Sequence, residues 1–254
     1  MWVRSALTYR VSFVAMVVGG VAMTALDFVA IAIMFAHIDE LGGFSLPEVA
    51  FLYGTSGVSF GLAHLLLGSF DGLGRRVRDG TMDVLLVRPV PVLAQVAADR
   101  FALHRVARGL QAGVFLGWAL LRLDVDWTMG RVLTVPVAVV SGAAIFGAVF
   151  VAGGAFQFWV RDAAEVQNSF TYGGTTMLQY PPTVFGRELV RGVTFVVPLA
   201  FVNWLPALYV LGREDPMGLP HWVDFASPAV AVVCCAVASL VWRAGVRSYV
   251  STGS

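Results

Sequence analysis

Lysine is absent from this chain of 254 residues, and all seventeen of its cationic side chains are arginine. A phosphate-binding loop requires a lysine that reaches the β- and γ-phosphates from a glycine-rich turn. The chain therefore cannot supply such a loop by itself. If the protein uses nucleotide hydrolysis, the hydrolysing site has to belong to a partner.

Charge of either sign is scarce as well. Charged residues make up 13% of the sequence and hydrophobic residues 58%, whereas an ordinary soluble domain has about 25% charged residues. The net charge of +1 gives no reason to expect a nucleic-acid partner. These proportions indicate a polytopic membrane protein.

Cysteine occurs only at positions 234 and 235, inside an apolar run. Adjacent cysteines lack the spacing of a structural disulfide or a zinc site. We therefore interpret them as small buried hydrophobic residues, and we expect no metal site. The predicted cytoplasmic connections contain no HExxH and no GxSxG motif, so no catalytic residue is expected.

Six long apolar stretches dominate what is present. A transmembrane helix needs about 20 mostly apolar residues. The sequence therefore predicts an all-α polytopic fold, a single transmembrane domain over residues 1–254 that begins with a short interfacial helix. Segment 166–186 is too polar and too rich in Gly and Pro for a span, so we expect it to run along the inner interface or dip into it. The six spans are placed near residues 12–36, 50–70, 105–123, 131–158, 189–210 and 227–246.

Arginine is distributed unevenly between the two sides of this arrangement. Cytoplasmic connections of membrane proteins are enriched in Lys and Arg, so the fuller side is expected to be cytoplasmic. The expected location is the cell (inner or plasma) membrane. Both termini then lie in the cytoplasm, which agrees with the even number of spans. Only Arg122, Arg131 and Arg213 fall outside. The other fourteen are placed inside: Arg4, Arg10, Arg75, Arg76, Arg78, Arg88, Arg100, Arg105, Arg108, Arg161, Arg187, Arg191, Arg243 and Arg247.

The largest cytoplasmic connection covers residues 71–104. Turn and cap chemistry at residues 79–81 is followed by a short helix over residues 82–87, which Pro89 ends. Leu85 and its neighbours give this helix an apolar surface surrounded by arginines. Such a helix can dock a cytoplasmic protein or lie on anionic lipid headgroups, and the residues leave both possibilities open.

Polar side chains inside the spans are candidates for a substrate path. Asp27 lies near the middle of the first span, where a charge costs roughly 2.5–3.5 kcal/mol, and His64 lies in the second. Both can line a translocation path, relay protons, or form hydrogen bonds between helices. Asn203, Trp204 and Tyr209 lie on the proline-containing fifth span, which is either a substrate-facing kinked helix or a structural kink alone.

Small residues repeat at four-residue spacing on two spans. Gly57 and Gly61 lie on the second, and Gly109, Gly113 and Gly117 lie on the third. Such stripes allow helix backbones to approach closely. They predict either packing within the chain or a face that meets a second chain.

Five segments carry a further signal: the Tyr9-Arg10 pair, DGTMDVLLVRPV (79–90), the Tyr180-Pro181 pair, TFVVPLAFVNWLPALYVLG (194–212) and SYVSTGS (248–254). Together, and in this order, they resemble a subfamily of type-2 ATP-binding-cassette (ABC) exporter permeases. Two departures from the family pattern are Trp204, where another aromatic residue is common, and the Pro-Pro pair at 181–182.

The resemblance implies a permease that works with a second permease, often a different related chain, and with two copies of a separate ATPase subunit. ATP and magnesium would bind to those ATPases, so no cofactor is expected on this chain. Membrane lipids are its other expected neighbours. The cargo stays open. The implied ATPase-coupling residues are Arg75, Arg76, Arg78, Asp79, Gly80, Thr81, Asp83, Leu85, Leu86, Arg88 and Pro89.

Two other classes of function remain open from the residues. A polytopic membrane enzyme would use Asp27 and His64 as an acid/base pair, although nothing in the sequence brings the two together. A membrane scaffold would carry no cargo. A neighbouring gene that encodes a phosphate-binding loop would favour the permease over both.

Overall fold

A computed structural model of the chain describes residues 19, 29, 33–99, 103–160 and 163–250. All regular elements in these ranges are helical, as the predicted all-α class requires. The interfacial helix, Asp27 and nearly all of the first span (12–36) lie outside the described residues.

Three expected spans match helices that are long and apolar enough to cross a membrane. The buried share of their apolar windows falls from 72% to 50% to 22% in chain order, so the first is central and the third is peripheral. The first is Leu46–Arg78, made of α3 (Leu46–Leu67), η1 (Gly68–Gly72) and α4 (Leu73–Arg78); the others are α8 (Met129–Phe156) and α13 (Ser227–Ser248).

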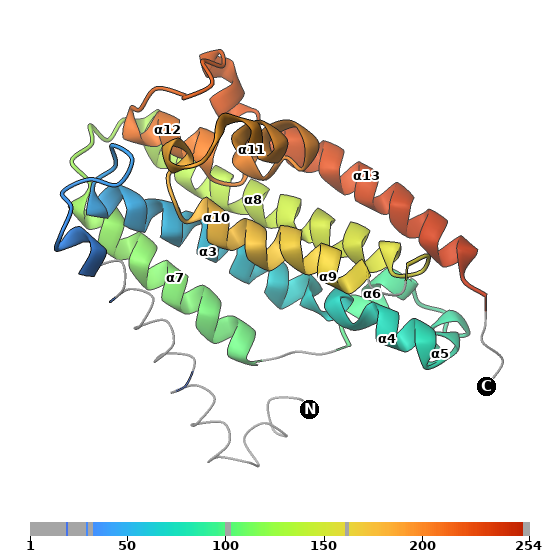
Figure 1. The fold of residues 1–254 in the computed structure, drawn as a ribbon. Coiled ribbons are helices and arrows are strands. Elements are labelled where there is room, and N and C mark those ends of the chain that lie inside the picture. Colours follow the sequence, from blue (N-terminus) through green and yellow to red (C-terminus); the bar gives the residue numbers. More distant parts are fainter. Residues whose placement is uncertain (1–18, 20–28, 30–32, 100–102, 161–162, 251–254) are drawn as a thin grey trace.

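Helix α7 (Leu103–Arg122) covers the predicted span 105–123. It packs along α3, α8 packs against another side of α3, and α13 packs on α8 (Figure 1). Arg105 and Arg108 lie in the first two turns of α7 and make it less apolar than the other long helices. The bundle has two ends. We call them the Glu48 end, where α3 begins, and the Asp71 end, where η1 follows α3.

Glycine allows α3 and α7 to approach closely. A Cβ atom at Gly61 would lie 2.7 Å from the Cα of Gly109, and one at Gly57 would lie 2.6 Å from the Cβ of Ala112. Close packing is therefore confirmed for these two α3 glycines and for Gly109. A Cβ at Gly117 would meet open space, so the predicted stripe on α7 is only partly used inside the chain.

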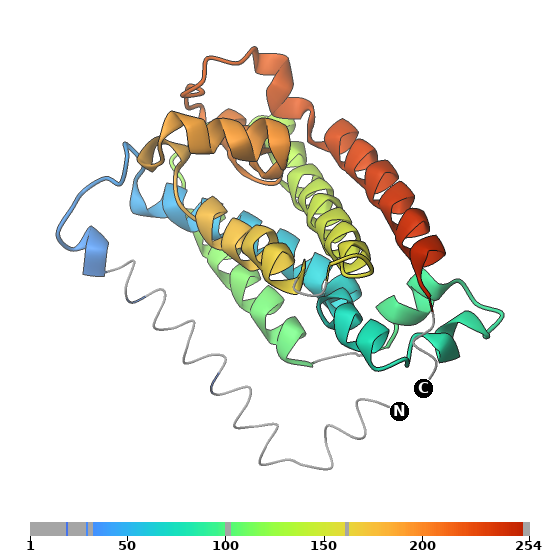
Figure 2. The same cartoon turned by 45° about the vertical axis from the view of Figure 1, so that its right-hand side comes forward.

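A continuous helix over residues 163–178 follows α3 in the opposite direction (Figures 1 and 2). It consists of α9 (Ala163–Asn168), the π-helical turn η2 (Ser169–Gly173) and α10 (Gly174–Leu178). We call it helix 163–178.

Three contacts set its register along α3. Gln167 binds Asp71, the Tyr172 ring packs 5.3 Å from the Phe60 ring, and the Ser56 hydroxyl donates to the Thr175 carbonyl over 3.4 Å. Helix 163–178 therefore runs from the Asp71 end of the bundle toward the Glu48 end.

The chain beyond this helix reaches the Glu48 end. The Thr183 hydroxyl donates to the carbonyl of Gly42, in the loop before α3, over 2.7 Å. The prediction that segment 166–186 stays at the inner interface is therefore wrong. Gln167, Thr171 and Thr175 are buried inside the protein, so the low hydropathy of the segment does not show that it lies at a surface.

Residues 187–211 form a bent pair of helical segments instead of the predicted fifth span (189–210). The pair comprises α11 (Arg187–Arg191) and η4 (Gly192–Val196), then η5 (Leu199–Phe201) and α12 (Trp204–Leu211), with an 82° bend between Arg187–Val196 and Leu199–Leu211. Val197 at the break is extended, and Pro198 after it lacks an N–H for a helical hydrogen bond.

Both ends of the bent pair lie at the Glu48 end. Thr183 precedes it, and Arg213 follows it and forms two hydrogen bonds to Glu48, of 2.9 and 2.8 Å. The pair therefore enters and returns on one side. Arg187, at the start of the pair, therefore lies at the opposite end of the bundle from Arg75 and Arg76, with which the prediction grouped it. Arginine remains concentrated at the Asp71 end.

Labelling from the two sides of the membrane tests this topology. We expect Arg75→Cys and Arg187→Cys, each in a background without Cys234 and Cys235, to react with an impermeant maleimide from opposite sides. Both positions are exposed, so reactivity reports sidedness. Reaction of both from the same side would restore the predicted fifth span.

Substitution of Gly61 tests the α3–α7 contact. Gly61→Val should lower the free energy of unfolding by about 1–3 kcal/mol, the usual cost of overpacking, because the new side chain meets the backbone of Gly109. The thermal midpoint in detergent measures the effect. Gly117→Val is the matched control and should leave the midpoint unchanged; equal losses in the two variants would contradict the packing.

Candidate functional site

The segment after α3 forms a compact, mostly helical structure at the Asp71 end. Helix α4 is followed by a turn in which Gly80 has a φ of +67°, a conformation that favours glycine. Helix α5 (Asp83–Leu86) comes next, and α6 (Val92–Ala97) begins after Pro91. The predicted short helix is thus present, one residue shorter than expected at each end.

Buried contacts hold α5 in place. Met82 and Leu85 are almost fully buried. The side-chain amide of Gln95 on α6 donates to the carbonyls of Leu85 (2.9 Å) and Val90 (2.7 Å), on either side of the chain reversal. Arg76 on α4 is paired with Asp99, which follows α6. The segment is therefore a supported structure, and Leu85, expected on its apolar surface, belongs to its interior.

The outer face of this segment is apolar with a cationic rim. Val87 is 82% exposed, and Val84 and Leu86 are 54% and 41% exposed. The side chains of Arg75, Arg78 and Arg88 are exposed around them. Fixed apolar side chains in the open are typical of a binding surface. We call residues 84–90 with these arginines the α5 surface.

The residue that follows α13 lies against α5. Tyr249, directly after α13, packs on Phe158 with ring centroids 6.0 Å apart and lies beside Asp83. Burial and the neighbouring Asp83 carboxylate raise the pKa of the Tyr249 hydroxyl. The α5 surface is therefore linked to α13 as well as to α3.

A buried polar cluster lies where this segment joins the bundle. The Asp71 carboxylate accepts hydrogen bonds from the Gln167 amide (2.5 Å) and from the Tyr172 hydroxyl (2.9 Å). The His64 Nε2 atom lies 3.1 Å from the same hydroxyl. Gln157 on α8 donates to Gln167 over 2.8 Å. Four separate parts of the chain thus meet around one carboxylate, which we call the Asp71 cluster.

Gln157 also connects the Asp71 cluster to α4, the first helix of the predicted coupling segment (residues 71–104). Its side-chain oxygen accepts from the N–H of Gly74 at the start of α4 over 2.6 Å, and its amide also reaches the carbonyl of Phe70 at 3.3 Å. The first turn of α4 is therefore held by a side chain of α8.

Asn203 forms a second polar group, in the Glu48 half of the bundle. Its amide donates to the carbonyls of Leu52 (3.0 Å) and Leu178 (2.8 Å), and its oxygen accepts from Thr55 over 2.6 Å. Both Asn203 and Trp204 are 1% exposed. These contacts tie α3, α10 and α12 together.

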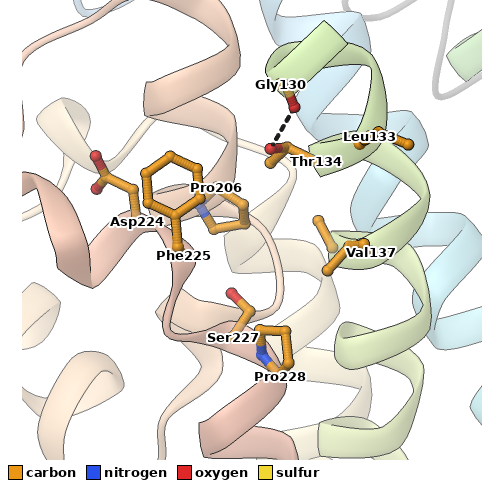
Figure 3. Close-up of a pocket in the computed structure, with 10 residues that line it drawn as sticks. Gly130, Leu133, Thr134, Val137, Pro206, Asp224, Phe225, Ser227 and Pro228 are labelled. Atoms are coloured by element: carbon orange, nitrogen blue, oxygen red, sulfur yellow. Dashed lines mark hydrogen bonds between the residues drawn. The ribbon is translucent and has the colours of Figure 1, made fainter.

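Tyr209 lies beside a small cavity of about 240 Å³. Its ring stacks edge-on to Phe225 with centroids 4.5 Å apart. Figure 3 shows Phe225 and Pro206 on one side of the cavity and Leu133 and Val137 of α8 on the other. Most of the side chains that line the cavity are apolar. The hydroxyl of Thr134 donates a hydrogen bond to the carbonyl of Gly130 over 2.9 Å and so already has a partner within its own helix.

The predicted site residues thus separate into distinct places. The coupling residues share the Asp71 end, His64 belongs to the Asp71 cluster, and Asn203 and Trp204 are buried near the other end. The roles of Asp71, Gln167 and Tyr172 were not foreseen, because residues nearly 100 positions apart meet only in the folded chain.

Substitution of Asn203 separates packing from a role in the substrate path. Asn203→Ala leaves two carbonyls and a hydroxyl without this partner, and each unpaired buried group costs roughly 1–3 kcal/mol. We expect a clearly lower thermal midpoint. Tyr209→Phe keeps the stack on Phe225 and should leave the midpoint unchanged. A normally stable Asn203→Ala protein with altered transport would instead support the predicted substrate path.

Comparison with known proteins agrees with this arrangement. A family profile described as "ABC-2 family transporter protein" matches residues 21–253. No curated protein and no solved structure matches the chain significantly. Because the profile covers nearly the whole sequence and the described helices include three apolar enough to cross a membrane, the chain belongs to the ABC-2 transporter family and is a membrane-embedded permease of an ABC transporter.

Proposed function

We propose that the chain is the permease subunit of an ATP-driven exporter in the cell membrane, with six spans and both termini in the cytoplasm. It forms the translocation pathway together with a second, related permease. Two copies of a separate ATPase bind at the Asp71 end and supply the energy. The chain itself hydrolyses nothing and holds no cofactor.

The α5 surface is the observation that carries this proposal. It combines exposed apolar side chains with a rim of arginines at the arginine-rich end of the bundle. Interfaces between proteins typically bury an apolar core inside a polar rim. The buried supports of α5 give the surface a fixed shape, which lowers the entropic cost of binding.

Orientation follows from the same end of the molecule. Arginine-rich connections stay in the cytoplasm, where a soluble ATPase would reach them. The Glu48 end, with the bent pair of residues 187–211, then faces outward. Six crossings are obtained if the predicted first span is counted with α3, α7, α8, residues 163–183 and α13.

A charge placed in the α5 surface tests the docking. Val87→Asp should weaken the affinity for the partner ATPase at least about tenfold in a co-purification assay, since an interface residue whose loss costs about 1.4 kcal/mol changes affinity by that factor. Its side chain is 82% exposed, so folding should be unaffected. Val184→Asp, 41% exposed at the Glu48 end, is the control.

The lipid alternative gives a different result in the same experiment. If the α5 surface rests on lipid headgroups, Val87→Asp and Arg88→Glu will each weaken the binding of a peptide of residues 71–104 to anionic vesicles. ATPase association and its stimulated hydrolysis would then stay at wild-type levels in both variants, and the docking proposal would be wrong.

A further inference from the structure

The Asp71 cluster joins the coupling segment to helix 163–178. Asp71 lies in η1, three residues before Gly74 of α4, whereas Gln167 and Tyr172 lie on the opposing helix. All three side chains are largely buried, with side-chain hydrogen bonds as short as 2.5 Å. Each carboxylate oxygen of Asp71 has its own donor from that helix, so the carboxylate is held at both oxygens.

The π-helical turn explains how two side chains of one helix can each donate a hydrogen bond to the Asp71 carboxylate, an arrangement that we call the grip on Asp71. In a regular α-helix, residues five apart point about 140° away from each other, since each residue turns the chain by about 100°. A π turn forms its hydrogen bonds from i to i+5 and so brings residues five apart onto one face. Gln167 lies two residues before the π turn Ser169–Gly173 and Tyr172 lies within it. The two are five residues apart, and both bind Asp71.

Room for this arrangement is provided by glycine on α8. A Cβ atom at Gly153 would lie 2.5 Å from the Cγ of Gln167, so only glycine leaves the Gln167 side chain in place. The guanidinium of Arg105 on α7 also interacts electrostatically with Asp71. Side chains or backbone from α3, α7, α8 and helix 163–178 therefore converge on the cluster.

Helix 163–178 leads directly into the bent pair of residues 187–211. Its last residue, Leu178, accepts a hydrogen bond from Asn203, just before α12. Two residues further on, the Tyr180 carbonyl accepts from the indole of Trp204 over 2.9 Å. These two hydrogen bonds connect helix 163–178 to the bent pair at the Glu48 end.

We propose that Asp71 is a positioning residue that couples the ATPase-binding segment to the bent pair, with the π turn holding Gln167 and Tyr172 on one face to grip its carboxylate. The inference rests on the proposed function, because the movement to be passed on starts at the α5 surface. Loss of the grip separates ATP hydrolysis from the rearrangement at the Glu48 end.

The experiment follows a nucleotide-driven change that needs no known cargo. The complex with its ATPase and second permease is reconstituted with Arg187→Cys as the only reactive cysteine. The maleimide labelling rate is compared with and without ATP and vanadate. Asp71→Asn and Tyr172→Phe are introduced separately; the second keeps the ring contacts with Phe60 and His64 and protects the test against misfolding.

Both variants should retain ATP hydrolysis and lose the vanadate-dependent change in labelling. Ser169→Ala and Thr176→Ala are the controls, since these exposed hydroxyls donate to backbone carbonyls of their own helix, and both should behave as wild type. Normal nucleotide-dependent labelling in Asp71→Asn and Tyr172→Phe would overturn the inference.

A parallel fall in thermal midpoint, hydrolysis and labelling would also overturn it, by showing a purely structural role. A wild-type chain that binds no ATPase would contradict the proposed function itself, and the inference would fall with it. Failure of the inference and failure of the proposed function are therefore distinguishable, because only failure of the proposed function is seen in the wild-type chain, without any substitution.

Discussion

Helix 163–178 has a polar face in a protein surrounded by lipid, and α3 is what makes this possible. A polar group without a partner in the hydrocarbon region costs several kcal/mol. Thr175, Tyr172 and Gln167 meet Ser56, His64 and Asp71 in turn along α3 and its continuation. This pairing sets the direction of the helix and therefore the end of the bundle at which the following residues emerge.

The two ends of the bundle consequently have different chemistry. At the Glu48 end, the Glu48–Arg213 ion pair and the Thr183–Gly42 hydrogen bond hold the bent pair against the start of α3. Arg213 also lies over the Phe44 ring, 5.3 Å from its centroid. At the Asp71 end, the α5 surface is left open above buried supports. One end is closed within the chain, and the other is available to a partner.

Local sequence signals predicted the elements whose structure depends on nearby residues. Hydropathy located α3, α8 and α13, and turn and proline chemistry located α5. The same signals failed for residues 189–210, which are apolar enough for a span but bend by 82° and return. They also failed for the interior position of Leu85 and for the Asp71 cluster, because burial and partners at sequence distances of 96 and 101 residues are not encoded in a local pattern.

By itself, the sequence determined that this is an arginine-only, lysine-free membrane chain with a short helix between a glycine turn and a proline, because composition and turn chemistry act locally. It could not determine which polar helix crosses the bundle and which apolar one turns back. That choice was made by the tertiary structure, since the cost of a polar side chain depends on whether a neighbouring helix or lipid faces it. The grip on Asp71 was decided in the same way, by a π turn and a glycine that matter only once α3, α8 and helix 163–178 have come together.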